Sequence, residues 1–219
     1  MLKINKNIYI YLLILINFTL KPQVLVMIDP AGDVKNPGRK IDNNFERTLT
    51  FNFVENLKNR LQEKYNLRCI LTRSPGEQVF ELQNASFANR LNADFYLSVH
   101  IFKSELVKPS VFIYNLVYNS VFDLANRVID SYKFVSIDQA HFLNIKKTQY
   151  FGQHIKNCLT QENYKKNFDF YGLYGIPVKS LVGIIAPALI IELGVADQEQ
   201  INSLIDPIIE SLSFLNITR

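Results

Sequence analysis

The sequence lacks the features that would mark a cysteine-bound metal, a nucleic-acid-binding surface or a repeat protein. Its 219 residues include two cysteines, Cys69 and Cys158, which lie in no CxxC or other metal-binding spacing. No block of like charges and no arginine-rich arm occurs, so nucleic acid is not implied as a partner. No internal repeat or low-complexity segment is present either. The hydrophobic share of 48% is ample for one folded core.

The N-terminus combines basic residues with a short apolar run. Lys3 and Lys6 precede the mostly apolar residues 8–20, a run shorter than the roughly 20 residues of a membrane-spanning helix. This pattern is typical of an export signal. We expect residues 1–23 to be a signal peptide or a short N-terminal anchor in a membrane, and the protein to reach the periplasm or cell envelope. A buried first helix or strand of the domain is the alternative.

Strand and helix patterns alternate through the rest of the chain, residues 24–219. Short apolar runs that end at turn residues predict strands at 24–28, 68–72, 94–101, 111–116 and 187–194. Helical spacing predicts helices at 43–66, from about 77 to 91, 121–132, 150–159 and 198–215, and the polar run 161–169 predicts a surface loop. The alternation predicts a single α/β domain: a mostly parallel twisted sheet with helices on both faces.

The loop after the first predicted strand is a candidate functional segment. Asp29 and Pro30 end the apolar run, and Gly32, Asp33 and Gly38 follow within a few residues. Ligands of open α/β sheets bind outside the carboxyl ends of the strands, so polar residues here are candidates for a site. A plain turn between strand and loop is the alternative.

An ordered set of short motifs identifies a resemblance. The motifs are Ile28-Asp29-Pro30, Asn36-Pro37-Gly38, Glu46, Leu71-Thr72-Arg73, Ala88-Asn89, Ala93-Asp94, Ser98-Val99-His100 and Pro187-Ala188-Leu189-Ile190-Ile191-Glu192-Leu193-Gly194. In their order and spacing the chain resembles the zinc-dependent N-acetylmuramoyl-L-alanine amidases, which cut the bond between muramic acid and the peptide stem of peptidoglycan. The resemblance runs from about Val24 to Ser211, with an apparent insertion at about 117–147. It implies a hydrolase of the cell wall with peptidoglycan as its partner.

The resemblance also implies a zinc site. In that family a His in the first loop, a Glu at the start of the first helix and a His at the end of the third strand hold one Zn²⁺, and a second Glu acts on the bound water. Glu46 and His100 match the second and third ligands, and Glu192 matches the catalytic glutamate. Where the family reads Asp-Pro-Gly-His-Gly, this chain reads Asp29-Pro30-Ala31-Gly32-Asp33. Gly32 therefore stands where the first ligand is expected.

The missing ligand leaves two interpretations, because a catalytic zinc typically uses three protein ligands and one water. In the first, Asp33 replaces the histidine, with His141 and His154 as more distant candidates, and the protein is a secreted amidase in which Glu192 moves the proton of the zinc-bound water. In the second, the protein is a non-catalytic cell-wall binding or regulatory module. If only the one ligand is lost, Gly32→His would restore zinc binding.

Each retained residue also has a simpler interpretation. Glu46 follows Asn43 by three residues, the spacing of a helix-capping box, and His100 could be a satisfied core histidine. Glu192 lies among apolar strand residues, where an ionised carboxylate needs a partner. Phe102 is a second departure, because the family usually has Asn at that position.

Overall fold

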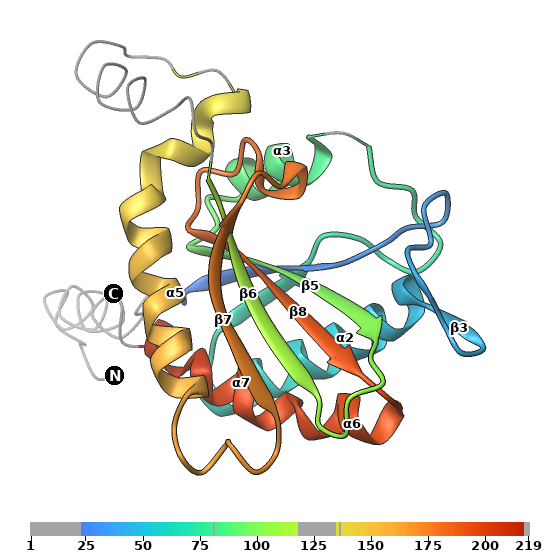
Figure 1. Ribbon diagram of the computed structural model, residues 1–219. Coiled ribbons are helices and arrows are strands. Elements are labelled where there is room, and N and C mark those ends of the chain that lie inside the picture. Colours follow the sequence, from blue (N-terminus) through green and yellow to red (C-terminus); the bar gives the residue numbers. More distant parts are fainter. Residues whose placement is uncertain (1–22, 81, 118–134, 136, 217–219) are drawn as a thin grey trace, which may run out of the picture.

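A computed structural model describes residues 23–80, 82–117, 135 and 137–216 (Figure 1). Its strands are β1 (Leu25–Pro30), β2 (Lys40–Ile41), β3 (Asn44–Phe45), β4 (Arg68–Leu71), β5 (Phe95–Lys103), β6 (Ser110–Leu116), β7 (Asp169–Ile176) and β8 (Ala188–Val195). Its α-helices are α2 (Glu46–Tyr65), α3 (Gln83–Arg90), α5 (Ile145–Leu159), α6 (Gln198–Ser203) and α7 (Ile205–Ser211). Short 3-10 helices are η1 (Ile137–Asn144), η2 (Lys179–Leu181) and η3 (Ser213–Asn216).

Six strands form one sheet in the order β4-β1-β5-β8-β6-β7. The first four strands of this order are parallel to one another, whereas β6 pairs antiparallel with β8 and parallel with β7. The chain leaves β1 for β4 on one side and later returns to β5 on the other side. In open α/β sheets ligands bind at the carboxyl ends of the strands beside such a change of direction. The predicted mostly parallel α/β sheet is confirmed.

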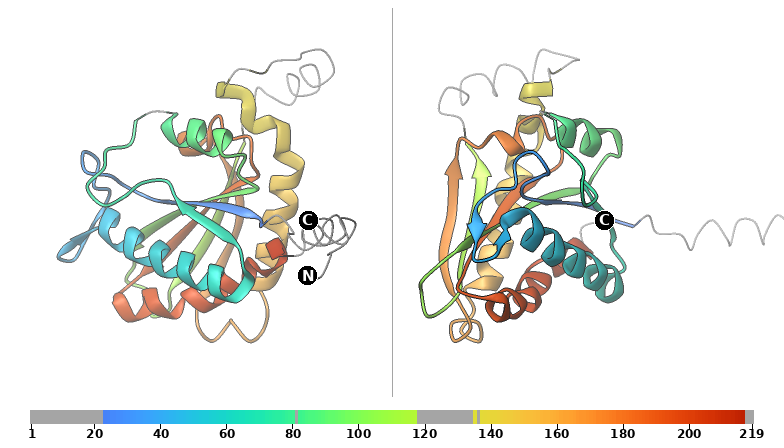
Figure 2. Two further views of the ribbon diagram at one scale, coloured as in Figure 1. Left: turned by 180° about the vertical axis from the view of Figure 1, so that it is seen from behind. Right: turned by 90° about the vertical axis from the view of Figure 1, so that its right-hand side faces the viewer.

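Helices cover the sheet on both faces, and the two views of Figure 2 show β1 running between α2 and α3. On one face α2, α5 and α7 enclose the larger core. The predicted four-residue spacing places Leu49, Phe53, Leu57 and Leu61 of α2 in that core. Because these side chains share one side of the helix, α2 packs along the sheet. Its first residue, Glu46, lies at the carboxyl edge of the sheet, in contact with His100 of β5.

The second face is covered only in part. A smaller core around Met27, Tyr96 and Ile190 packs against α3 and η2. Further along the same strands His100 and Glu192 are only partly buried, with 29% and 19% of their side chains exposed. The carboxyl-terminal half of this face is therefore accessible, and the β2–β3 hairpin projects beside it (Figure 1).

Several element boundaries differ from those predicted. The strand β7 was not predicted; it is an edge strand with two glycines, which weaken the strand pattern. The helix predicted from about 77 is formed only over α3. The closing helix is divided into α6, α7 and η3, and Pro207 lies in the first turn of α7, where its missing N–H is tolerated. The helix predicted at 150–159 begins earlier, at Ile145.

Two predicted segments lie mostly outside the residues that the structure describes. Residues 1–22 and the helix predicted at 121–132 are not among the described residues. Of the apparent insertion at 117–147, the part that is described forms η1 and the start of α5. Within the described ranges, no helix has both the length and the apolar character needed to cross a membrane.

Candidate functional site

Three residues singled out by the sequence meet at the accessible half of the sheet. His100 of β5 and Glu192 of β8 are direct partners in the parallel register, so both side chains leave the same face. Glu46, the first residue of α2, reaches them over the carboxyl edge: its Oε1 lies 3.1 Å from His100 Nδ1. The backbone N–H of Ile101 donates to the same oxygen at 3.3 Å.

Glu46 is held as a buried carboxylate with only 3% of the residue exposed. Burial raises its pKa, but hydrogen bonds from His100 and from the backbone and side chain of Arg39, together with the charge of Arg39, lower the pKa to about 2. The N-cap of α2 is Phe45, without a side-chain cap. The predicted capping role for Glu46 is therefore wrong, since its oxygens bind groups of the site.

A glycine makes the close approach to Glu46 possible. Gly38 has φ +77°, and a Cβ at this position would lie 2.7 Å from Glu46 Oε2. That space is needed because the same oxygen accepts the backbone N–H of Arg39 at 3.1 Å. The Asn36-Pro37-Gly38 motif thus forms the turn that brings residue 39 onto the carboxylate.

Arg39, which sequence reasoning missed, connects the two glutamates. Its Nε lies 3.2 Å from Glu46 Oε2, and its Nη2 donates to Glu192 Oε1 at 2.6 Å. The guanidinium also lies over the ring of Phe102, 5.3 Å from the ring centroid. Phe102, the second departure from the family pattern, thereby supports the arginine. The available signal was an arginine directly after the Asn36-Pro37-Gly38 motif and seven residues before Glu46.

The second oxygen of Glu192 is also occupied. Tyr114 of β6 donates its hydroxyl to Glu192 Oε2 at 3.0 Å. Burial, the hydrogen bond to Glu192 and the charge of that carboxylate raise the pKa of Tyr114 to about 12. Glu192 therefore has the partners that its apolar strand requires, one cationic and one neutral.

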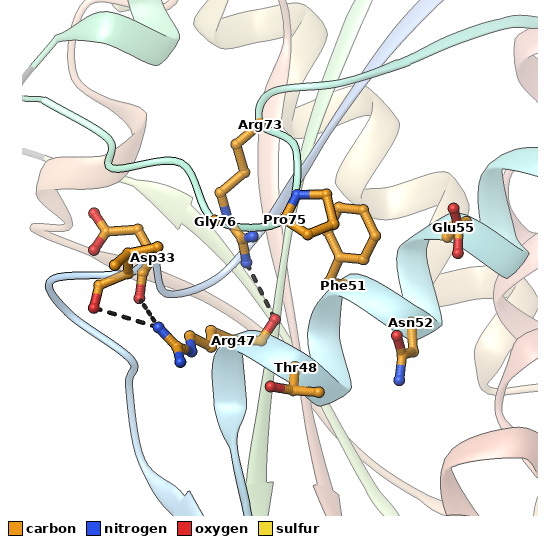
Figure 3. A pocket seen from close by; sticks show the side chains of 10 residues that line it. Asp33, Arg47, Thr48, Phe51, Asn52, Glu55, Arg73, Pro75 and Gly76 are labelled. Carbon is orange, nitrogen blue, oxygen red and sulfur yellow. Dashed lines mark hydrogen bonds between the residues drawn. The ribbon is translucent and has the colours of Figure 1, made fainter.

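Asp33 lies apart from this group. Its carboxylate accepts backbone N–H groups of Asn36 at 2.6 Å and Val79 at 3.0 Å. Burial raises its pKa, but these backbone hydrogen bonds outweigh that effect and lower it. Figure 3 shows Asp33 beside Arg47 and Arg73 at a different cleft, of about 570 Å³. The carboxylate thus fixes the loop after β1.

The backbone at Gly32 resists a side chain. Gly32 has φ +77°, and a Cβ would lie 2.9 Å from Arg47 Cβ and 3.1 Å from the carbonyl oxygen of Pro37. A histidine at this position would need the loop to move, in addition to adopting a left-handed backbone. The structure therefore does not favour Gly32→His as a simple restoration of the first ligand.

The two remaining histidines are in other parts of the fold. His141 lies in η1, where its Nδ1 accepts the backbone N–H of Gly183 at 3.1 Å. His154 lies in α5 and stacks on Phe214, with ring centroids 5.2 Å apart. Neither is brought to Glu46.

A zinc ion does not fit this arrangement. Zinc takes carboxylate and imidazole ligands, and Glu46 and His100 supply one of each, but a catalytic site needs a third protein ligand. Among the described residues, no group of three or more His, Cys, Asp and Glu side chains is placed to hold a metal. The cationic guanidinium of Arg39 already pairs with both Glu46 and Glu192.

Comparison with protein families agrees with the motifs. The family model described as N-acetylmuramoyl-L-alanine amidase matches residues 26–207. The chain belongs to this family. It is thus an amidase-like protein of a hydrolase family directed at peptidoglycan, and the resemblance drawn from the motifs is confirmed. Among curated proteins, no sequence matches this chain.

Solved structures of amidases share the fold. An N-acetylmuramoyl-L-alanine amidase from Clostridium difficile 630 is 17% identical, with a TM-score of 0.66 over 91% of this chain and 100% of that one. AmiC2 of Nostoc punctiforme is 15% identical, with a TM-score of 0.64 and coverages of 91% and 100%. Ami1 from Mycobacterium smegmatis is 11% identical, with a TM-score of 0.62 and coverages of 90% and 98%. The amidase-family domain therefore accounts for nearly the whole length of these chains.

Proposed function

We propose that this amidase-family domain binds peptidoglycan at the junction between N-acetylmuramic acid and the stem peptide. The observation that carries the proposal is the meeting of Glu46, His100 and Glu192 at the accessible carboxyl half of the sheet, in a chain of this family. All three positions were predicted from the family motifs. The pair of polar side chains on β5 and β8 gives the junction a defined place to bind.

Hydrolysis of the amide at this junction is the first form of the function, and family membership favours it. Glu192 is the group that would transfer protons, because its carboxylate faces the accessible side of the sheet. Its hydrogen bonds from Arg39 and Tyr114 fix its position. For acid–base work a water molecule or the substrate would have to reach an oxygen of Glu192, and in the structure these oxygens accept hydrogen bonds from Arg39 and Tyr114.

Binding without hydrolysis is the second form, and Arg39 is the specific observation that favours it. The guanidinium supplies a fixed positive charge beside both glutamates, in a donor set that a zinc ion does not fit. A guanidinium can hold a carbonyl or carboxylate of the stem peptide by hydrogen bonds. It cannot lower the pKa of a water molecule as a zinc ion does.

Purified sacculi separate these possibilities. We would measure the fraction of protein that sediments with sacculi and the new α-amino groups released from them, for wild type, Glu192→Gln and the matched surface variant Glu63→Gln. Failure of wild type to sediment would overturn the proposed function. If wild type and Glu63→Gln release α-amino groups from the sacculi and Glu192→Gln does not, the function is hydrolysis. If wild type sediments with the sacculi but releases no α-amino groups, the function is binding alone.

The location of the protein follows from its family, which acts on the cell wall, outside the cytoplasm or in the envelope. We propose that residues 1–23 direct the export, with the basic start and short apolar run as support. Fusing these residues to a reporter that is active only after export tests this. A reporter that stays in the cytoplasm would contradict it.

A further inference from the structure

Four aromatic rings continue the accessible face away from Glu192. Phe112 and Tyr114 lie on β6, and Tyr171 and Tyr174 lie on β7. The rings of Phe112 and Tyr171 are stacked with centroids 4.7 Å apart, and the planes of the Phe112 and Tyr114 rings are nearly parallel, with centroids 6.3 Å apart. The ring of Tyr174 lies 6.1 Å from that of Tyr114. We call these four residues the aromatic platform.

The two rings on β7 are exposed and yet held in place, whereas Phe112 and Tyr114 are partly buried. Tyr171 and Tyr174 are each 45% exposed. The Tyr174 hydroxyl donates to the backbone carbonyl of Tyr171 at 2.6 Å. Gly172, with φ +139°, leaves room for the ring: a Cβ there would lie 3.1 Å from the Tyr174 ring. These contacts fix the rings before any ligand arrives, which lowers the entropy cost of binding.

The platform is continuous with the site. Phe112 is the register partner of Glu192 between β6 and β8, and Tyr114 donates its hydroxyl to the Glu192 carboxylate. A ligand that reaches Glu192 therefore extends directly over the rings. Exposed apolar side chains that adjoin a functional site are candidates for ligand contacts.

The chemistry of the platform indicates its ligand. Its four side chains are uncharged, whereas the charges of the site lie at Arg39, Glu46 and Glu192. Flat rings pack against the C–H faces of pyranose sugars. The hydroxyl hydrogens of Tyr114 and Tyr174 are already donated within the protein, but tyrosine hydroxyl oxygens can still accept hydrogen bonds from sugar hydroxyl and acetamido N–H groups. Charged groups of the stem peptide are matched instead by the guanidinium of Arg39.

We propose that the aromatic platform binds the N-acetylated sugar rings of the glycan strand. This inference rests on the proposed function, and it divides the ligand between two parts of one surface. The glycan lies over β6 and β7, and the stem peptide starts at Glu192 and Arg39. The platform would then set the direction in which the glycan strand crosses the domain.

Binding of a soluble β-1,4-linked N-acetylglucosamine tetramer to the full chain tests the platform, measured by calorimetry. Tyr171→Ala and Tyr174→Ala should each weaken binding about tenfold, the value of one lost ring contact. Tyr174→Phe keeps the ring but loses the hydroxyl bond to the Tyr171 carbonyl, so it should weaken binding by less than Tyr174→Ala does. Tyr150→Ala, which removes a 58% exposed tyrosine of α5, is the matched control and should not change binding.

The possible results separate the two proposals. Wild type that sediments with sacculi, together with alanine variants that bind the tetramer normally, overturns the platform and leaves the proposed function intact. Wild type that binds neither sacculi nor tetramer overturns both. A dimer of wild type that becomes monomeric in Tyr171→Ala, measured by analytical ultracentrifugation, would make the platform an interface between two copies and would also overturn it.

Discussion

Arg39→Ala removes the cation that joins the two glutamates of the site. In the folded protein Arg39 binds Glu46 through Nε and Glu192 through Nη2. Its side chain is 46% exposed, whereas that of Glu46 is 5% exposed. The variant therefore leaves one nearly buried carboxylate and one partly buried carboxylate close together without their shared positive partner. We expect lower stability and a new affinity for divalent cations.

The stability loss can be worked out from the pKa of Glu46, which lies at about 2 instead of 4.5. At about 1.4 kcal/mol for each unit of pKa, the net lowering from 4.5 to about 2 is worth about 3.5 kcal/mol in favour of the charged form. His100 and two backbone amides remain in the variant, and exposure of Arg39 screens its share. A net loss of about 1 to 2 kcal/mol is expected at pH 7, which lowers the Tm by about 2 to 8 °C for a domain of this size.

The same variant should respond to zinc, because Glu46 and Glu192 then lose their shared cation. With His100 they are not placed to hold a metal in the wild-type structure, so the response requires the two freed carboxylates to turn toward the ion. If it binds zinc with a Kd of about 1 µM, about 100 µM zinc stabilises it by about 2.7 kcal/mol and restores the Tm. Wild type should show no such rise. Thermal unfolding with and without zinc measures both effects, together with zinc bound per chain after dialysis.

Two controls define the result. Lys103→Ala removes another cation of the same edge, one that pairs with Asp42 at 2.9 Å, and should not create a zinc response. His100→Ala in the Arg39→Ala background should abolish the response. Equal zinc uptake by wild type and Arg39→Ala would refute the argument that Arg39 takes the place of the ion, and an unchanged Tm would refute the energy assigned to the bridge.

Three further outcomes are expected. The depressed pKa of Glu46 means that its contribution to stability is present above pH 4.5 and is lost as the pH falls toward 2. Glu46→Gln should therefore flatten the acid side of the curve of stability against pH, measured by urea unfolding. A curve like that of wild type would contradict this. Asp33→Asn should cost about 1 to 2 kcal/mol in urea unfolding, because it weakens two charge-assisted bonds to backbone amides, and should leave the zinc response of the Arg39→Ala variant unchanged; loss of that response would make Asp33 a ligand. Leu57→Ala should cost about 2 to 5 kcal/mol because it opens a cavity in a fully buried part of α2, and a strong chelator should leave the Tm of wild type unchanged.

The sequence by itself determined the elements whose patterns are local. The apolar runs of β1, β5 and β8 and the four-residue spacing of α2 predict those elements. Burial on one face of a sheet or helix produces a pattern of apolar residues that are close together in the sequence. Family motifs also placed Glu46, His100 and Glu192 in one site. In contrast, β7 was missed, since an edge strand half exposed to solvent has no continuous apolar run.

Only the tertiary structure decided what those residues bind. Arg39 meets Glu192 across 153 positions of sequence, and no local pattern reports a contact that the β1 loop and β8 create only when the sheet assembles. The role of Asp33 depends in the same way on the backbone of Val79, 46 residues away. Charge and hydrogen-bonding capacity can be read from the sequence, but the partner of each group is set by the order of the strands and the path of the loops between them.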